Sequence, residues 1–136
     1  MEKLARVGIT LPVKLLNRFD DEITAYANRS DAIRHLMRDY LVERQWEGNE
    51  TVVGTITLVY DHHQTEQHGS LTDFQHRAGE MILSTLHIHL NRDLCLETIV
   101  IRGQASKVLQ LSEQLIASRG VVHGRLSATT LGDWAA

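Results

Sequence analysis

Hydrophobic and polar positions alternate strictly over residues 6–11, close to the start of the chain. This period of two predicts a short strand with one apolar and one polar face. Apolar residues then recur at helical spacing, first from Pro12 through Tyr26 and again after the helix-start pair Ser30 and Asp31. One short strand and two helices cannot enclose a hydrophobic core, so we expect two copies of this segment to intertwine.

Beyond residue 50 the pattern predicts a second domain with four strands and two helices. The expected order is strand, helix, strand, strand, helix and strand, over residues 51–60, 70–79, 81–90, 94–102, 106–119 and 121–130. A polar connection over residues 61–69 should precede the first helix, with Ser70 as its cap. Gly103 and Gly120 should end the third strand and the second helix. This βαββαβ order is the ferredoxin-like arrangement, with two helices on one face of the sheet.

Residues 47–50 have the composition of a linker between these two parts. We therefore expect an N-terminal domain over residues 1–48 and a C-terminal domain over residues 51–136. The fold class is α+β, in which a βαα unit of the ribbon-helix-helix type precedes a ferredoxin-like domain.

The composition narrows the class of protein. Hydrophobic residues make up 43% of the 136 residues, and no apolar run approaches the ~20 residues that span a bilayer. The first ten residues lack the apolar core of a signal peptide. The single cysteine, Cys95, cannot form an intrachain disulfide, which fits a reducing compartment. We expect a cytoplasmic protein without a membrane segment.

Charge is distributed unevenly along the chain. The net charge is −3, yet residues 1–18 carry Lys3, Arg6, Lys14 and Arg18 against one acidic residue. A basic arm on an acidic protein indicates a small, directed contact with an anion rather than a broad nucleic-acid groove.

The segment over residues 86–95 predicts a metal site on a hairpin. Alternation along a strand places His87 and His89 on one face, and residues 91–93 have turn chemistry. Reversal at that turn can bring Cys95 beside the two imidazoles. Imidazole and thiolate ligands exclude magnesium and calcium and leave nickel, copper, zinc or cobalt. The alternative interpretation is a pair of edge-strand histidines beside an inert buried thiol.

The predicted N-terminal ribbon has the pattern of a DNA-binding element. A two-stranded ribbon fits the major groove, and its outward residues would be Arg6, Gly8 and Thr10 from each chain. The start of the second helix, with Arg29 and Ser30, could hold a DNA phosphate. A module that only dimerises would show the same periodicity.

The whole chain resembles the nickel-responsive regulators of the NikR family. The segments that carry the resemblance are residues 6–11, 28–34, 85–89, 95–97 and 118–124. The resemblance implies a ribbon-helix-helix domain and an ACT-like metal domain, assembled as a homotetramer of two dimers. It also implies binding to double-stranded operator DNA and repression of nickel-uptake genes.

The resemblance further implies a set of metal ligands. Nickel would be bound, one ion per subunit, by His87, His89, Cys95 and a fourth histidine from a neighbouring subunit, for which His76 is the matching position. Three imidazoles and one thiolate favour a square plane, which suits Ni²⁺ or Cu²⁺ better than tetrahedral Zn²⁺. Cu²⁺ and Zn²⁺ are the expected competitors.

Three further residues are expected near this site. The resemblance places Tyr60 and His62 close to the metal or to an auxiliary site. Glu97 lies two residues after Cys95 and should share its strand face, where it could hydrogen-bond a ligand.

The sequence departs from the family pattern at two places. The ribbon of the family alternates Arg-x-Thr-x-Thr, whereas Gly8 stands at the middle position here and removes one base-reading side chain. The family has acidic residues at the positions of Asp31 and His35, where a second cation bridges its domains, so His35 weakens the case for that site.

Two other functions fit the residues without the resemblance. The first is metal storage or delivery by a protein whose N-terminal unit only dimerises. The second is regulation by a small effector bound between ACT-like domains. An enzyme is not expected, because four protein ligands leave a metal no open position for substrate.

Overall fold

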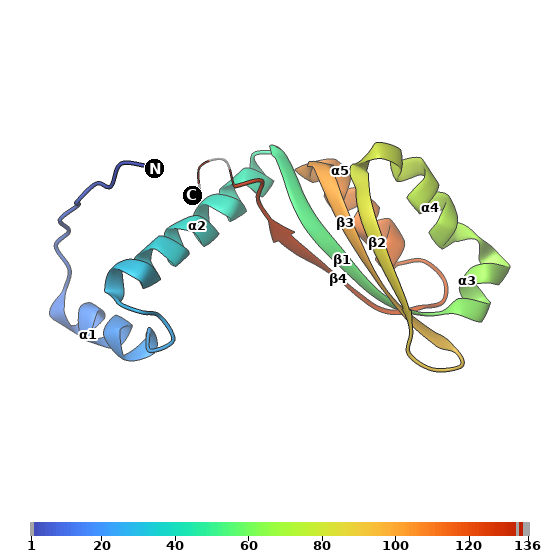
Figure 1. The fold of residues 1–136 in the computed structure, drawn as a ribbon, viewed down its shortest axis with the longest axis horizontal. Helices are drawn as coiled ribbons and strands as arrows, with labels where there is room; N and C mark the ends of the chain where they lie inside the picture. The colour runs from blue at the N-terminus through green and yellow to red at the C-terminus, as the bar shows by residue number, and fades with distance from the viewer. Residues whose placement is uncertain (1, 133, 135–136) are drawn as a thin grey trace. The chain divides into compact units, whose positions relative to one another are not determined.

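The computed structural model describes residues 2–132 and residue 134, apart from the side chains of residues 66–68 and 70. It divides into two compact units, one built from residues 2–41 with the described residues after 131, the other from residues 42–131. Figure 1 shows the helices and strands of both units. None of the helices in the described residues is long and apolar enough to cross a membrane.

The first unit contains helix α1 (Val13–Glu22) and most of α2 (Arg29–Glu47). Pro12 is the N-cap of α1, one residue before the first turn where it was expected, and the helix ends at Glu22, so Tyr26 lies outside it. The cap of α2 is Asn28 rather than Ser30, because the Oδ1 of Asn28 accepts a hydrogen bond of 2.8 Å from the backbone N–H of Asp31.

Residues 2–12 have neither helical nor strand structure (Figure 1). A ribbon strand takes its hydrogen bonds from a neighbouring strand, and no described part of the chain pairs with these residues. Their apolar side chains are exposed, 81% at Val7 and 64% at Ile9. The ribbon over residues 6–11 therefore stays a prediction.

The second unit is a four-stranded antiparallel sheet with helices, in the order β2-β3-β1-β4. Its elements are β1 (Thr51–Asp61), α3 (His62–His68), α4 (Ser70–Ala78), the short 3-10 helix Gly79–Met81, β2 (Ile82–His89), β3 (Leu94–Gln104), α5 (Ala105–Ile116) and β4 (Val121–Thr129). This is the α+β architecture expected for a ferredoxin-like or ACT-like domain.

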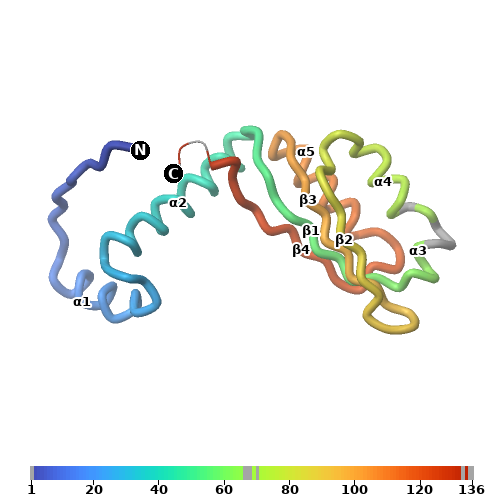
Figure 2. The backbone as a smooth tube through the Cα atoms, viewed as in Figure 1, coloured from blue at the N-terminus to red at the C-terminus, as the bar shows by residue number. Residues whose placement is uncertain are grey.

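One face of the sheet forms the core of this unit. Alternate residues of β1 and β3 are buried, including Ile56, Leu58 and Ile99. They pack against Leu71 of α4 and Leu115 of α5, so both helices cover the same face (Figures 1 and 2). The period of two in these strands follows directly from burial on one side only.

Four local expectations are wrong in this unit. Gly69 rather than Ser70 is the N-cap of α4, and α5 ends at Ile116 with Ala117 as its C-cap, before Gly120. Residues 62–68 form helix α3 instead of a polar connection, because the side chain of Asp61 caps the backbone N–H groups of His63 and Gln64. Gly103 does not end β3 but pairs with Val52. Met81 packs over this glycine, and a Cβ there would lie 3.1 Å from the Met81 Cε.

The end of α2 is tied to the sheet by hydrogen bonds inside the second unit. The indole N–H of Trp46 donates to the carbonyl of Thr129 over 3.0 Å. The Oδ1 of Asn49 accepts from the backbone N–H of Ser106 over 2.8 Å, at the start of α5. Residues 47–50 thus form a hydrogen-bonded turn, in which Asn49 has a φ of 54°.

Substituting Gly54 by Ala should destabilise this unit. The new Cβ would lie 2.8 Å from the backbone oxygen of Ser127 and 3.4 Å from the Trp46 ring, so β4 or the indole must move. We expect the free energy of unfolding in urea to fall by about 1–3 kcal/mol. Gly8→Ala is the matched control, because nothing lies within 4 Å of its Cβ. Equal stability of both variants would contradict the close approach at Gly54.

Candidate metal centre

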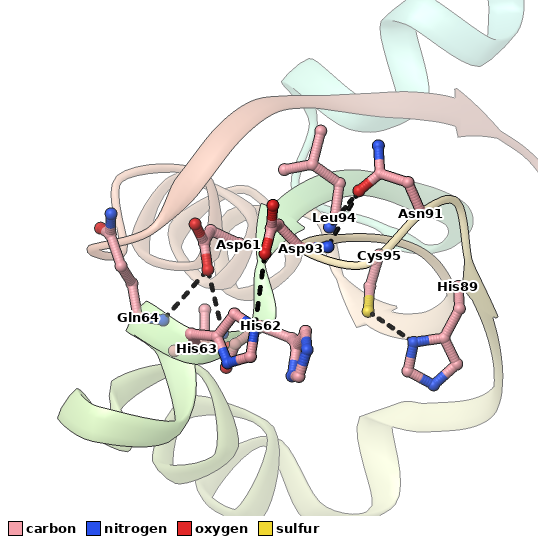
Figure 3. A network of polar contacts seen from close by, with 10 residues as sticks. Asp61, His62, His63, Gln64, His89, Asn91, Asp93, Leu94 and Cys95 are labelled. Carbon is pink, nitrogen blue, oxygen red and sulfur yellow. Dashed lines mark hydrogen bonds and ion pairs between the residues drawn. The ribbon is translucent and has the colours of Figure 1, made fainter.

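The β2–β3 hairpin brings the predicted ligand residues together. Its register places His89 opposite Cys95 and His87 opposite Glu97. The turn is closed by Asn91, whose Oδ1 accepts two hydrogen bonds of 2.9 Å from the backbone N–H groups of Asp93 and Leu94 (Figure 3). This Asx turn fixes the relative position of the two strand ends.

The ligand atoms of His87, His89 and Cys95 all lie within 4.8 Å of one another. The Sγ of Cys95 lies 3.4 Å from the Nδ1 of His89 (Figure 3), and the two imidazole centroids are 5.1 Å apart. The thiol is fully buried whereas both imidazoles are exposed. The sulfur is thus fixed in the core, and the nitrogens reach it from the sheet edge.

These distances fit a transition-metal ion. With bonds of about 2.0–2.3 Å to nitrogen and sulfur, neighbouring ligand atoms lie about 3 Å apart and opposite ones a little over 4 Å. The 3.4 Å between the Cys95 Sγ and the His89 Nδ1 lies within this span, and the 4.8 Å that bounds all three ligand atoms exceeds it slightly. Two imidazoles and one thiol select nickel, copper, zinc or cobalt over the hard cations.

A cleft of about 400 Å³ opens beside these ligands. It is lined by Tyr60, His62, Thr65, Leu71, Thr72, Gln75, His87, His89 and Glu97. The Tyr60 ring meets His87 edge-on with centroids 6.0 Å apart, and His62 meets His89 in the same way at 5.9 Å. The structure therefore places both residues beside the predicted ligands.

Glu97 lies in the same cleft, on the strand face of Cys95. It is only 6% exposed, and its Oε1 accepts a hydrogen bond of 3.1 Å from the Nε2 of Gln75 on α4. The expectation of a shared face holds, but sequence reasoning missed Gln75. A glutamine on an amphipathic helix has no local signature that sets it apart from a surface residue.

His76 does not join this cluster within the described residues. It is exposed on α4 and lines a separate hollow with Asp73 and Arg77. One chain thus supplies three of the four predicted ligands at close range and presents His76 elsewhere.

The start of helix α3 is hydrogen-bonded to the β2–β3 hairpin. The backbone N–H of His62 donates to the carbonyl of Asp93 over 3.1 Å, and the Nε2 of His63 lies 3.5 Å from the Asp93 Oδ1 (Figure 3). Asp93 was not among the predicted site residues. Its backbone contact has no sequence signal, because it depends on where α3 begins.

Comparison with known proteins supports nickel as the metal of this domain. Residues 53–129 match the family described as NikR C terminal nickel binding domain. A curated relative from Solibacter usitatus, named "Putative nickel-responsive regulator", is 49% identical over 97% of both chains. Relatives of the same name from Geobacter sulfurreducens and Pyrococcus horikoshii are 46% and 44% identical, over 98% and 96% of each chain. This chain belongs to the family of nickel-responsive regulators. The resemblance seen in the sequence is confirmed, and the chain is a regulator rather than an enzyme.

The residues expected to contact DNA in this regulator lie in the first unit. Arg6, Gly8, Thr10 and Ser30 are all exposed. The guanidinium of Arg29 is paired with Asp20, through Nε at 3.0 Å and Nη2 at 2.6 Å. These hydrogen bonds raise the pKa of Arg29 and lower the pKa of Asp20.

The two residues of the doubtful interdomain cation site, Asp31 and His35, lie close to each other within the first unit. The Asp31 carboxylate lies 3.6 Å from both the His35 Nε2 and the Arg34 Nη2, and it accepts from the backbone N–H of Ala27 over 3.3 Å. The His35 ring also packs against Tyr26, with centroids 5.2 Å apart. Asp31 thus already has cationic and neutral donors from its own unit.

Substituting Asn91 by Ala should weaken metal binding, although Asn91 is not one of the predicted ligands. Loss of the Oδ1 acceptor frees two backbone N–H groups and loosens the turn between His89 and Cys95. We expect nickel affinity, measured by competition with a chelator, to fall about 10-fold. Asn91→Asp is the matched control, because its carboxylate can accept the same two bonds. Unchanged affinity in Asn91→Ala would show that the turn does not position the ligands.

Proposed function

We propose that this regulator is a nickel-dependent DNA-binding repressor in which His87, His89 and Cys95 of one subunit and His76 of another bind one Ni²⁺ per subunit. The observation that carries the proposal is the convergence of two imidazoles and a buried thiol within 4.8 Å. The ion would supply a square-planar coordination preference, which Cu²⁺ shares and Zn²⁺ does not. Tyr60, His62 and Glu97 would surround and orient the ligands.

The first unit supports the DNA-binding half of the proposal. It has an apolar groove of about 480 Å³ that is open to solvent, lined by Ile9, Leu11, Leu15, Leu16, Phe19, Ile33, Leu36, Met37, Tyr40 and Leu41. Several of these side chains are exposed, among them Ile9, Met37 and Tyr40, and a contiguous exposed apolar patch indicates a protein partner. The occupant that fits is a second copy, because the alternating residues 6–11 supply both the strand to pair and the apolar side chains that line the groove.

Pairing of two such segments would form an intertwined ribbon-helix-helix dimer. Its ribbon would present Arg6 and Thr10 to base edges in the major groove, and Gly8 would allow close backbone approach. Arg29 and Ser30, at the start of α2, would contact phosphate, with Arg29 exchanging Asp20 for the DNA backbone.

Assembly links the two halves of the proposal. His76 is exposed and away from the ligands of its own chain, so a fourth ligand from a neighbouring subunit would join two metal units. A homotetramer of two dimers would result, and coordination across its interface would shift the population toward arrangements in which both DNA heads reach their half-sites. The proposed repressor acts in the cytoplasm, and its proposed targets are nickel-uptake genes.

Ligation across an interface can be tested by mixing subunits. His76→Ala subunits lack the donated ligand and His87→Ala subunits lack one receiving ligand, so neither variant alone has a complete site. Mixed tetramers should regain complete sites, measured as nickel bound per chain after removal of weakly held metal. Mixing of each variant with itself is the control. No regain after verified subunit exchange would show that all the ligands come from one chain.

The two classes of DNA contact should respond differently to substitution. Arg6→Ala should cost about 1–3 kcal/mol per base contact and relax specificity at one position of each half-site. Arg29→Ala should weaken binding to all sequences and reduce its salt dependence. The measurement is nickel-saturated binding to a panel of operator variants at fixed salt. If Arg6→Ala changes neither affinity nor base preference, the ribbon does not read DNA and storage or delivery of nickel becomes the better account.

A further inference from the structure

Helix α4 contacts the core of the unit, the metal cleft and an outer hollow. Leu71, Phe74 and Ala78 pack against the core. Thr72 and Gln75 line the metal cleft. His76, the residue after Gln75, lines an outer hollow instead of the cleft. Leu71, Phe74 and Ala78 are three or four residues apart and share one face of the helix, so their packing and the cleft contact of Gln75 together fix the rotation of α4 about its axis.

The contact on the cleft side is a hydrogen bond to a buried carboxylate. Glu97 is 6% exposed and lies opposite His87 in the β2–β3 register, and its Oε1 accepts from the Nε2 of Gln75 over 3.1 Å. A buried carboxylate that loses a donor pays a large desolvation cost. The pair therefore resists any rotation of α4 that moves Gln75 out of the cleft.

Rotation is what ligation within one chain would require. Consecutive helix residues point about 100° apart, and His76 lies outside the cleft that Gln75 lines. Turning His76 toward the His87, His89 and Cys95 of its own chain would pull Leu71 from the core and separate Gln75 from Glu97.

We propose that the Gln75–Glu97 pair is a positioning device that sets the rotation of α4 and so directs His76 toward a second subunit. The role rests on the proposed function, because it assumes that His76 is a ligand. It assigns to Gln75 a part in metal binding that requires no contact with the metal. The pair also connects the strand of Cys95 to the helix that carries the donated ligand.

An exchange of the two side chains tests this proposal. Gln75→Leu removes the donor at similar volume, and Gln75→Glu places two carboxylates face to face. The double variant Gln75→Glu/Glu97→Gln restores the hydrogen bond with donor and acceptor reversed. Gln110→Leu is the matched control, because it makes the same exchange at an exposed glutamine of α5 that does not line the metal cleft.

Two readouts are needed, one of them without metal. In the metal-free full-length chain, both single variants should speed amide hydrogen exchange over residues 71–78 by about 10-fold to 100-fold, while β1 and β3 keep their protection. Nickel affinity should fall about 10-fold or more in the same variants. The double variant should return the exchange rates and the nickel affinity to within about threefold of the unsubstituted protein. A threefold change corresponds to less free energy than the loss of one hydrogen bond.

The outcomes separate the proposal from the function on which it rests. Wild-type exchange and affinity in Gln75→Leu, or a double variant as defective as the single ones, would overturn the positioning role. If His76→Ala leaves nickel affinity unchanged, the ligand set fails, whereas the exchange rates of the metal-free chain still report whether the pair holds α4.

Discussion

The register of the β2–β3 hairpin is the constraint on which the metal centre depends. His89 stands opposite Cys95 and His87 opposite Glu97, so one pairing places two imidazoles, a thiol and a buried carboxylate on the same face. A shift by one residue would turn every one of these side chains to the other face. The Asx turn at Asn91 opposes that shift, because its side chain closes the hairpin at a fixed length.

Both units of the chain are incomplete in ways that a second copy can satisfy. The first unit leaves an apolar groove open, and the second gathers three proposed ligands while His76 lies outside their cluster. The open groove and the missing fourth ligand would be satisfied by different kinds of contact. Burial of apolar area would hold the DNA heads together at all times, whereas a ligand donated across an interface would act only when the metal is bound. This difference separates permanent assembly from regulated assembly.

Local sequence patterns predicted most of the second unit and the cluster of three predicted ligands in its site. The His87, His89 and Cys95 cluster needs only strand alternation and one turn, and both are visible within ten residues. Features that depend on distant neighbours were missed. Gly103 stays in β3 because Met81 covers it, and Gln75 reaches Glu97 only once α4 has packed. Helix α3 is polar on all sides, so hydrophobic periodicity gave no signal for it. The ribbon depends on pairing between chains, which no pattern within one chain can demonstrate.

The central claim is that the buried thiol and the two exposed imidazoles are a nickel site, and absorbance under nickel titration tests it most directly. A coordinating thiol loses its proton, and the thiolate should give a charge-transfer band in the near ultraviolet that rises to one equivalent of nickel per chain. Cys95→Ser should abolish the band, and His123→Ala, an exposed histidine on β4, should retain it. A band that survives the loss of Cys95 would contradict the account.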